Sequence, residues 1–341
     1  MSTYAGYLDK YADAGRGAGP TVSVVVPCYR VGKQIGRVLR AIGPEVALIY
    51  CVDDDCPERS GVAAEEIAAT DPRIRVIHHE RNKGVGAAVV SGYRRALQDG
   101  ADIIVKLDGD GQMDPKRIPE LVGPLLSGEA DYVKANRFFC LEGLRSMPWI
   151  RLVGNAGLSF LSKLSTGYWT LFDPTNGFTA IHASVARALP LDKLADRYFF
   201  ESDILFRLNT LRAVVAEVPI DAVYGDETSS LSPLKSLVQF PVYHLRNFLK
   251  RLFYNYFLRN FSIASVNLVA GLAMLTFGIV FGTVEWIQAY TSGQLASAGT
   301  VMLAALPVIL GIQLILNFIG YDMASVPQSP IHRKLLPSGR G

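Results

Sequence analysis

The sequence predicts an α/β domain with a mostly parallel sheet, followed by an amphipathic helix and a hairpin of two membrane-spanning helices. Short apolar runs alternate with helical stretches over roughly the first hundred residues, as in parallel α/β sheets. Near the C-terminal end, two long stretches are almost free of charged residues. Between these regions, apolar and basic residues repeat at helical spacing.

The composition fits this combination. Of 341 residues, 50% are hydrophobic and 19% are charged, which excludes an intrinsically disordered chain. The net charge of +3 is too small to indicate a nucleic-acid partner. Four cysteines in a chain of this length do not form a disulfide framework.

Strands and helices alternate from residue 21 onward. The apolar runs that indicate strands lie at 21–26, 46–52, 73–78 and 102–107, and the helical stretches at 33–42, 63–69 and 84–98. This order is typical of a parallel sheet with helices on both faces. Ligands of such sheets bind beyond the carboxyl ends of the strands.

Polar residues cluster at the expected strand ends. In the last cluster, Asp108 and Asp110 leave a buried strand with a glycine between them, and Gln112 adds a neutral oxygen. Oxygen ligands of this kind bind Mg²⁺ or Mn²⁺, usually together with substrate phosphates. A polar turn with internal hydrogen bonds is the other interpretation.

Two earlier clusters suggest contacts with a nucleotide. Asn82, Lys83 and Gly84 precede a helix whose first backbone amides could bind an anion. The stretch lacks the Gly-Lys-Ser/Thr ending of a phosphate loop, and close packing of the helix start is the alternative. Asp53 and Asp54 follow the second strand, where they could accept hydrogen bonds from a base or ribose, or lie in a solvated turn.

The C-terminal region predicts two membrane spans. No charged residue occurs in 261–284 or in 286–321. We expect spans at about 263–284 and 298–320, joined by a turn over 285–297. A pair of buried helices in a soluble core is the alternative interpretation.

Basic residues flank both spans, and the connecting turn has none: Lys235, Arg246, Lys250, Arg251 and Arg259 come before, and Arg333, Lys334 and Arg340 after. The positive-inside rule then places the α/β domain and both termini in the cytoplasm, with the hairpin in the inner (cytoplasmic) membrane. Residues 1–20 have no apolar core and are not expected to be a signal peptide. The Pro- and Ser-rich tail is expected to be loosely ordered.

Apolar residues at helical spacing, including Val242, Leu245, Leu249 and Phe253, predict an amphipathic helix that lies on the membrane. An ordinary packing helix between domain and hairpin is the alternative. The chain therefore divides into an extension (1–20), the α/β domain (21–232), the amphipathic region (233–260), two spans (261–322) and a tail (323–341).

Together these motifs resemble glycosyltransferase family 2, whose members have the GT-A fold. The matching stretches are Val-Val-Pro-Cys-Tyr-Arg at 25–30, Val-Asp-Asp at 52–54, Asn-Lys-Gly-Val-Gly-Ala at 82–87, Asp-Gly-Asp-Gly-Gln at 108–112, Asn-Gly-Phe at 176–178 after Asp173, and Phe-Phe-Glu-Ser-Asp at 199–203. The hairpin narrows the resemblance to the polyprenyl-phosphate glycosyltransferases, which include dolichyl-phosphate mannose synthase and bacterial undecaprenyl-phosphate sugar transferases. It covers about residues 20–320.

The resemblance implies ligands and residue roles. A nucleotide-sugar donor, with UDP or GDP, would contact Pro27, Tyr29, Asp53, Asp54, Asn82, Lys83, Gly84, Asp108, Asn176, Glu201 and Asp203. Mg²⁺ or Mn²⁺ would bind Asp108, Asp110 and Gln112, and a polyprenyl-phosphate acceptor would bind Arg137, Arg151 and Asn155. Asp110, Asp173 and Arg137 would be catalytic. Membrane lipids and a second copy of the chain, in a dimer or tetramer, are the other expected partners, with Gly271 and Gly278 suited to helix contact.

The acceptor decides the expected mechanism. A lipid phosphate is already ionised at neutral pH, so it can attack the anomeric carbon without a general base, in a single displacement with inversion. A hydroxyl acceptor on a glycan or glycolipid would need a base, and Glu201 and Asp203 are the candidates. The loop 224–230 lacks the Lys or Arg that members of the family often carry there. A catalytically silent membrane scaffold is a further alternative, which the Asp108 and Asp110 pair disfavours.

Overall fold

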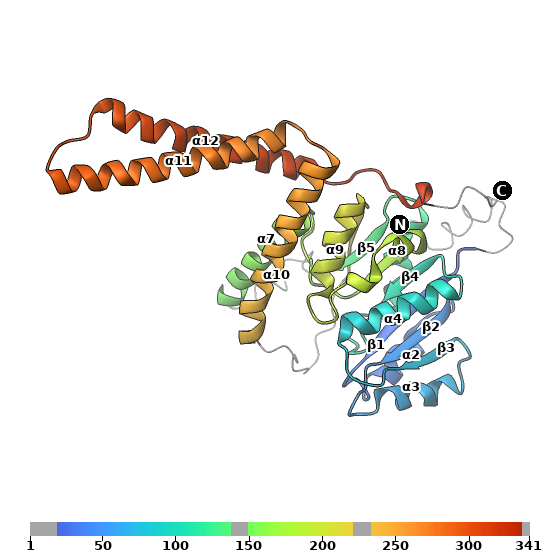
Figure 1. The fold of residues 1–341 in the computed structure, drawn as a ribbon. Coiled ribbons are helices and arrows are strands. Elements are labelled where there is room, and N and C mark those ends of the chain that lie inside the picture. Colours follow the sequence, from blue (N-terminus) through green and yellow to red (C-terminus); the bar gives the residue numbers. More distant parts are fainter. Residues whose placement is uncertain (1–18, 138–148, 221–232, 336–341) are drawn as a thin grey trace. The chain divides into compact units, whose positions relative to one another are not determined.

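A computed structural model describes residues 19–137, 149–220 and 233–335 of this chain. Contacts divide the chain into two compact units, each described by itself below. The first contains residues 1–248 and 327–341, and the second contains residues 249–326. The chain therefore leaves the first unit once and returns to it after the second (Figure 1).

Within the described residues, seven strands form one sheet in the order β3-β2-β1-β4-β6-β5-β7. The strands are β1 (Val22–Cys28), β2 (Val46–Asp53), β3 (Ile74–His78), β4 (Ile103–Lys106), β5 (Tyr132–Asn136), β6 (Thr179–His182) and β7 (Val215–Pro219). Only β6 runs antiparallel to its neighbours, and the other described pairings are parallel. The mostly parallel sheet expected from the sequence is confirmed.

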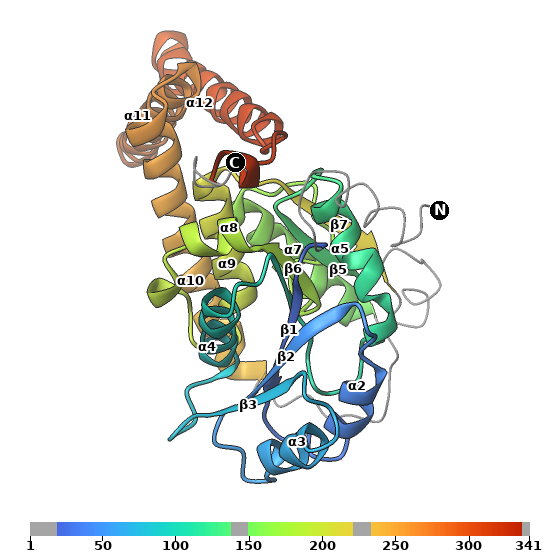
Figure 2. The same cartoon turned by 90° about the vertical axis from the view of Figure 1, so that its right-hand side faces the viewer.

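Helices lie on both faces of this sheet. They are α2 (Ile35–Ala41), α3 (Ser60–Ala68), α4 (Val85–Gln98), α5 (Ile118–Leu126), α7 (Trp149–Thr166), α8 (Ala183–Ala188) and α9 (Phe200–Leu211), with short 3₁₀ turns η1 (Pro115–Arg117), η2 (Leu191–Lys193) and η4 (His332–Lys334). Figure 2 shows α4 on one side of the central strands and α2 on the other. β1 is buried along its whole length, which explains its unbroken apolar sequence.

The two faces of the sheet differ in chemistry. Alternate residues of β1 and β4, such as Val24 and Val105, join a large apolar cluster with α2, α3 and α5. The opposite face carries the buried polar residues Lys106, Lys134 and Thr179. A buried polar face is costly unless its groups are paired, so these residues need polar partners in the segments that cover this face.

The second unit contains the two long apolar helices α11 (Ile263–Ser292) and α12 (Ala298–Ala324). Both are long and apolar enough to cross a membrane, and only 22% and 11% of their most apolar windows are buried. This exposure disfavours the alternative of soluble core helices. The predicted turn over 285–297 is wrong in extent, because α11 continues to Ser292 and ends at Gly293 with a positive φ of 67°.

Glycines bring the two helices of the hairpin together. A Cβ on Gly271 would lie 3.1 Å from the carbonyl oxygen of Gly311, and one on Gly311 would lie 2.8 Å from that of Gly271. Gly278 meets the backbone of Ala304 in the same way. Gly271 and Gly278, suggested by the sequence as helix-contact residues, thus pack within one chain.

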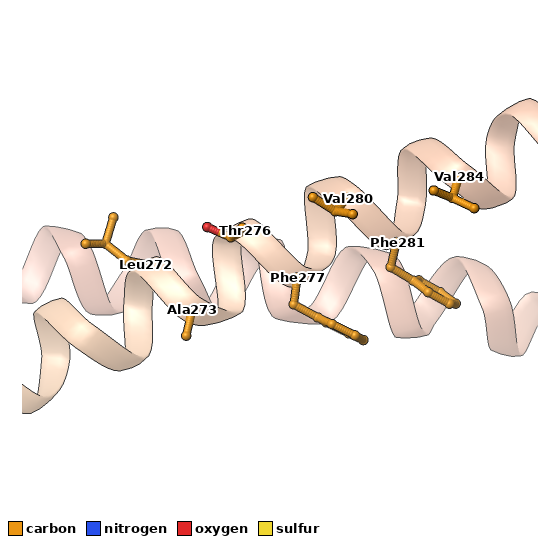
Figure 3. Close-up of a pocket in the computed structure, with 7 residues that line it drawn as sticks. All are labelled: Leu272, Ala273, Thr276, Phe277, Val280, Phe281 and Val284. Carbon is orange, nitrogen blue, oxygen red and sulfur yellow. The ribbon is translucent and has the colours of Figure 1, made fainter.

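The outer surface of α11 remains apolar. A shallow hollow on this helix is lined by Leu272, Ala273, Thr276, Phe277, Val280, Phe281 and Val284 (Figure 3). A surface of this kind fits lipid chains or another apolar helix.

A buried ion pair closes the base of the hairpin. Both terminal nitrogens of the Arg251 guanidinium group contact the carboxylate of Asp322, at 2.6 and 2.9 Å. The Tyr256 hydroxyl donates to the same carboxylate. Arg251 lies in α10 (Pro233–Phe253) and Tyr256 in the π-helical turn η3 (Tyr254–Arg259), so the pair joins the start of the hairpin to its end. Both charges are almost fully buried, and each satisfies the other.

The tail after α12 is ordered where the structure describes it, which corrects the expected loose order. The backbone amides of Ile331 and His332 donate to the buried carboxylate of Asp131, and His332 Nδ1 lies 2.8 Å from it. The His332 ring stacks on His182, with centroids 4.5 Å apart. The chain thus returns to the α/β domain by specific polar contacts.

Candidate active site

The carboxyl ends of β1, β2 and β4 meet at one edge of the sheet and bring the predicted residues together. Pro27 and Cys28 pair with Val52 and Asp53, and Val25 pairs with Lys106. Tyr29 and Asp108 therefore lie just beyond β1 and β4, and Asp53 is the last residue of β2. Tyr29 is exposed, whereas Asp53 is largely buried and accepts a hydrogen bond from the Cys56 amide at 3.1 Å.

Asp54 organises the loop before α4. Its carboxylate accepts hydrogen bonds from the amides of Lys83 and Gly84, at 2.9 and 2.7 Å, and from His79 at 2.7 Å. Asn82 donates to the Asp54 carbonyl oxygen. The predicted residues of these two clusters are thus connected by hydrogen bonds. The Asp54 side chain is buried, and its oxygens accept hydrogen bonds from other groups of the protein.

The glycines of this loop have a packing role. Gly84 has a φ of 104°, which favours glycine, and a Cβ there would lie 2.5 Å from the carbonyl oxygen of Asp196. A Cβ on Gly86 would lie 2.1 Å from that of Ala195. The Ala87 amide donates to the Asp196 carbonyl at 3.0 Å. The close packing of the helix start, given above as the alternative, is therefore present.

Asp108 is held by a buried lysine that the sequence analysis did not single out. Lys106 Nζ lies 3.0 Å from Asp108 Oδ1 and 2.6 Å from Glu201 Oε1. Burial alone would lower the pKa of Lys106, but the two carboxylates outweigh it and raise that pKa above its usual value. Its signal in the sequence is a charged residue in the last position of an apolar strand.

The residues predicted to bind a metal have suitable donors and space. Asp108 leaves 38% of its side chain exposed, and Asp110 Oδ1 accepts a hydrogen bond from the Gln112 amide across Gly111, whose φ is 79°. Gly177 leaves a cradle, because a Cβ there would lie 2.1 Å from Asp108 Oδ2. Among the described residues, no three His, Cys, Asp or Glu side chains cluster as metal ligands. Two carboxylates and an amide oxygen still suit Mg²⁺ or Mn²⁺, which shares its remaining positions with phosphates and water.

A second buried lysine lies in the same row of the sheet. Thr179 of β6 pairs with Lys106 of β4 on one side and with Lys134 of β5 on the other. Lys134 Nζ donates to the carbonyl oxygen of Asn176 at 2.7 Å, and its burial lowers its pKa. The two lysines therefore hold two segments of the site, the end of β4 and the Asn176–Gly177 turn.

Arg137 and Asp173, both predicted to be catalytic, form an ion pair. Arg137 Nε lies 2.8 Å from Asp173 Oδ2, and a second guanidinium nitrogen lies 3.1 Å from Oδ1. Asp173 is fully buried, whereas 21% of the Arg137 side chain is exposed. Glu217, absent from the prediction, accepts from the amides of Phe172 and Asp173 and so positions this turn.

The carboxylate of Asp203 has an internal role. It accepts hydrogen bonds from the Ala195 amide, from Arg207 and from Asn247 of α10, each at 3.0 or 3.1 Å. Both of its oxygens are therefore engaged by the protein.

Two predicted acceptor residues fall where side chains are not described. Arg151 and Asn155 lie on the backbone of α7, and their side chains are outside the described residues. The loop 224–230 is also outside them.

Comparison with known proteins identifies the family. A model of glycosyl transferase family 2 matches residues 23–189. The undecaprenyl-phosphate mannosyltransferase of Micrococcus luteus is 31% identical over 210 residues, which cover 59% of this chain and 83% of that protein. The UDP-N-acetylglucosamine–dolichyl-phosphate N-acetylglucosaminyltransferase of Methanococcus voltae is 29% identical over 222 residues, covering 61% and 88%.

The fold agrees with this relationship. Glucosyl-3-phosphoglycerate synthase from Mycobacterium tuberculosis, solved with Mn²⁺, UDP-glucose and phosphoglyceric acid, aligns with a TM-score of 0.53 at 23% identity, covering 73% of this chain and 83% of that one. The expected GT-A architecture is confirmed. This protein is a glycosyltransferase, and the chain belongs to glycosyltransferase family 2.

Proposed function

We propose that the protein transfers a sugar from a UDP- or GDP-sugar to a polyprenyl phosphate at a membrane, with inversion. The main support is that a polar edge of the sheet and a pair of long apolar helices occur in the same chain. Polar residues line the carboxyl edge of a family 2 sheet, and two long apolar helices follow. Relatives from two organisms, named as acting on undecaprenyl or dolichyl phosphate, match about three fifths of the chain.

The donor would lie along the edge from β1 to β4. Pro27, Tyr29 and Asp53 would contact the nucleoside, and the loop held by Asp54 would lie beside them. A divalent ion held by Asp108, Asp110 and Gln112 would neutralise the charge that develops on the departing nucleoside diphosphate. Asn176, at the turn held by Lys134, would contact the sugar.

The acceptor phosphate would bind Arg137, together with Arg151 and Asn155. A guanidinium group keeps its charge and can bind a phosphate through two hydrogen bonds. The ion pair with Asp173 holds the Arg137 side chain and leaves 21% of it exposed. The phosphate oxygen is the nucleophile, so no side chain has to remove a proton, and the two engaged oxygens of Asp203 agree with that.

The membrane would bring the acceptor to the enzyme. On α10 the apolar side chains Val242, Leu245 and Leu249 are exposed, as expected for a helix lying at an interface. The hairpin would span the bilayer with both of its ends in the cytoplasm. Assembly into a dimer or tetramer through the apolar surface of the hairpin is part of this proposal.

The test is a transfer assay on the purified full chain in detergent. Undecaprenyl or dolichyl phosphate is incubated with labelled UDP- and GDP-sugars, with Mn²⁺ or Mg²⁺ and in parallel with EDTA. We expect label in the organic phase from one donor, and no label with EDTA. Label on a glycan or glycolipid hydroxyl, with none on the lipid phosphate, would contradict the proposal.

A further inference from the structure

A charge problem arises at Asp108 if the proposed function is correct. Lys106 Nζ lies 3.0 Å from Asp108 Oδ1, the oxygen beside the one that faces Gly177. A divalent ion on Asp108 would therefore have a buried ammonium group as a near neighbour. Like charges repel strongly where water is scarce, so Lys106 alone would weaken metal binding.

The carboxylate of Glu201 contacts Lys106 and can offset its positive charge. Its Oε1 lies 2.6 Å from Lys106 Nζ, and only 13% of its side chain is exposed. The residue comes from α9, which lies 95 residues further along the chain. Glu201 Oε2 is buried and has no hydrogen-bond partner among the described residues. The carboxylate thus faces the interior of the domain.

We propose that Glu201 is a positioning residue that serves as the counter-ion of Lys106. Lys106 fixes Asp108 through Oδ1 and leaves Oδ2 toward the cradle at Gly177. Glu201 cancels the lysine charge, so that Asp108 is oriented without repulsion of the metal. This inference rests on the proposed function, and it replaces both a direct sugar contact and a general-base role for Glu201.

The test measures Mn²⁺ binding by the full chain in detergent, with free Mn²⁺ followed by electron paramagnetic resonance. Glu201→Gln leaves the lysine charge uncancelled, so the dissociation constant for Mn²⁺ should rise about tenfold or more. Lys106→Met/Glu201→Gln removes both charges, so the constant should return to within about threefold of wild type. At saturating Mn²⁺ the double variant should still turn over slowly, because Asp108 is no longer held.

Two further variants complete the comparison. Glu201→Asp keeps the negative charge, so its dissociation constant for Mn²⁺ should be close to that of wild type. This variant can be measured even if Glu201→Gln does not fold. Glu217→Gln is the matched control, since its hydrogen bonds go to Phe172, Asp173 and Asn136 and none goes to Lys106 or Asp108. Its Mn²⁺ affinity should not change.

The outcomes separate this inference from the proposed function. Unchanged Mn²⁺ binding by Glu201→Gln, or a double variant as weak as Glu201→Gln, would overturn the counter-ion role. The second result would instead make Glu201 a metal ligand. If the wild-type protein binds Mn²⁺ and Asp110→Ala binds it equally well, the metal lies elsewhere. In that case the proposed site itself is wrong.

Discussion

Buried carboxylates in this domain are each paired with a specific donor. Asp54 binds two backbone amides and His79, Asp203 binds Arg207 and Asn247, and Glu201 binds Lys106. Leaving such a group unpaired costs several kcal/mol, which explains why each carboxylate has a partner at hydrogen-bond distance. Asp108 and Asp110 differ from them because both keep part of their side chains exposed at the edge of the sheet.

Asp110→Ala tests the role of this exposed pair. The substitution removes a carboxylate from the proposed metal site, and turnover should fall by about a thousandfold, since metal stabilisation of a leaving group contributes several kcal/mol. The melting temperature should change little, because the side chain is not buried. Transfer to polyprenyl phosphate is measured beside the thermal transition. Turnover near the wild-type rate would remove Asp110 from the site.

Gly177→Ala tests the cradle beside Asp108. The added methyl group would meet Asp108 Oδ2 at 2.1 Å and Lys106 Nζ at 2.4 Å, so one of them must move. A displacement of about 1 Å at a reacting centre lowers turnover by about a hundredfold. Gly157→Ala on α7 is the control, because its added Cβ meets no other part of the described structure within 4 Å. Equal turnover in the two variants would contradict the prediction.

At the scale of elements, the molecule combines two kinds of helix packing. α4 meets the sheet through Gly92, whose absent Cβ leaves room for Val25. α11 and α12 meet each other through Gly271, Gly278 and Gly311, where backbones approach closely. Close approach replaces the hydrophobic effect as the source of stability when the surroundings are lipid.

Gly311→Val tests the packing of the hairpin. Its Cβ would lie 2.8 Å from the Gly271 carbonyl oxygen, so the helices must separate at a cost of about 1–3 kcal/mol. Gly320→Val on the same helix is the matched control, since no atom lies within 4 Å of its Cβ. Thermal melting in detergent should show a lower transition temperature for Gly311→Val alone. An equal effect of both substitutions would point to helix propensity instead.

At the scale of the whole molecule, the chain returns to the α/β domain after the hairpin. His332 docks on Asp131 and stacks on His182, at the ends of β5 and β6. Burial would raise the pKa of Asp131, but hydrogen bonds from His332 and the backbone outweigh it and lower that pKa. The segment that follows the hairpin thus ends in ordered structure.

The docking of the tail makes stability depend on pH. Burial, and to a lesser degree His332, lowers the pKa of His182 to about 4, whereas an unfolded histidine titrates near about 6.5. Between these values the unfolded chain binds a proton that the folded chain does not, so the free energy of unfolding falls as the pH falls, by up to about 3 kcal/mol. His244, whose pKa burial lowers to about 4, adds to the effect in the same window.

Thermal melting between about pH 7 and pH 4.5 measures this dependence. The transition temperature should drop across the range, and less in His182→Phe, which keeps a ring against His332 but cannot titrate. Asp131 stabilises the folded chain throughout this window, because its pKa is lowered by folding. It adds to the pH dependence only when the pH falls below about 4, where the carboxylate of the unfolded chain becomes protonated. An equal drop in wild type and His182→Phe would exclude His182 as the cause.

Local sequence patterns were sufficient for the first four strands, for their parallel order and for the two long apolar helices. Periodicity and charge are properties of neighbouring residues, so they can be read without the fold. The sequence pattern failed at 285–297, where Glu285 ended the charge-free stretch and the residues from Tyr290 to Gly293 suggested a short turn. One charged residue does not end a helix whose backbone hydrogen bonds continue.

Only the tertiary structure decided which charges meet. Lys106 and Glu201 are 95 residues apart, and Asp131 and His332 are 201 apart. Their pairing depends on the strand order, in which β6 inserts antiparallel between β4 and β5 and aligns Lys106, Thr179 and Lys134 in one row. Residue type predicts that a buried lysine needs a carboxylate, but the long-range topology chooses that carboxylate, because ion pairing requires proximity in space.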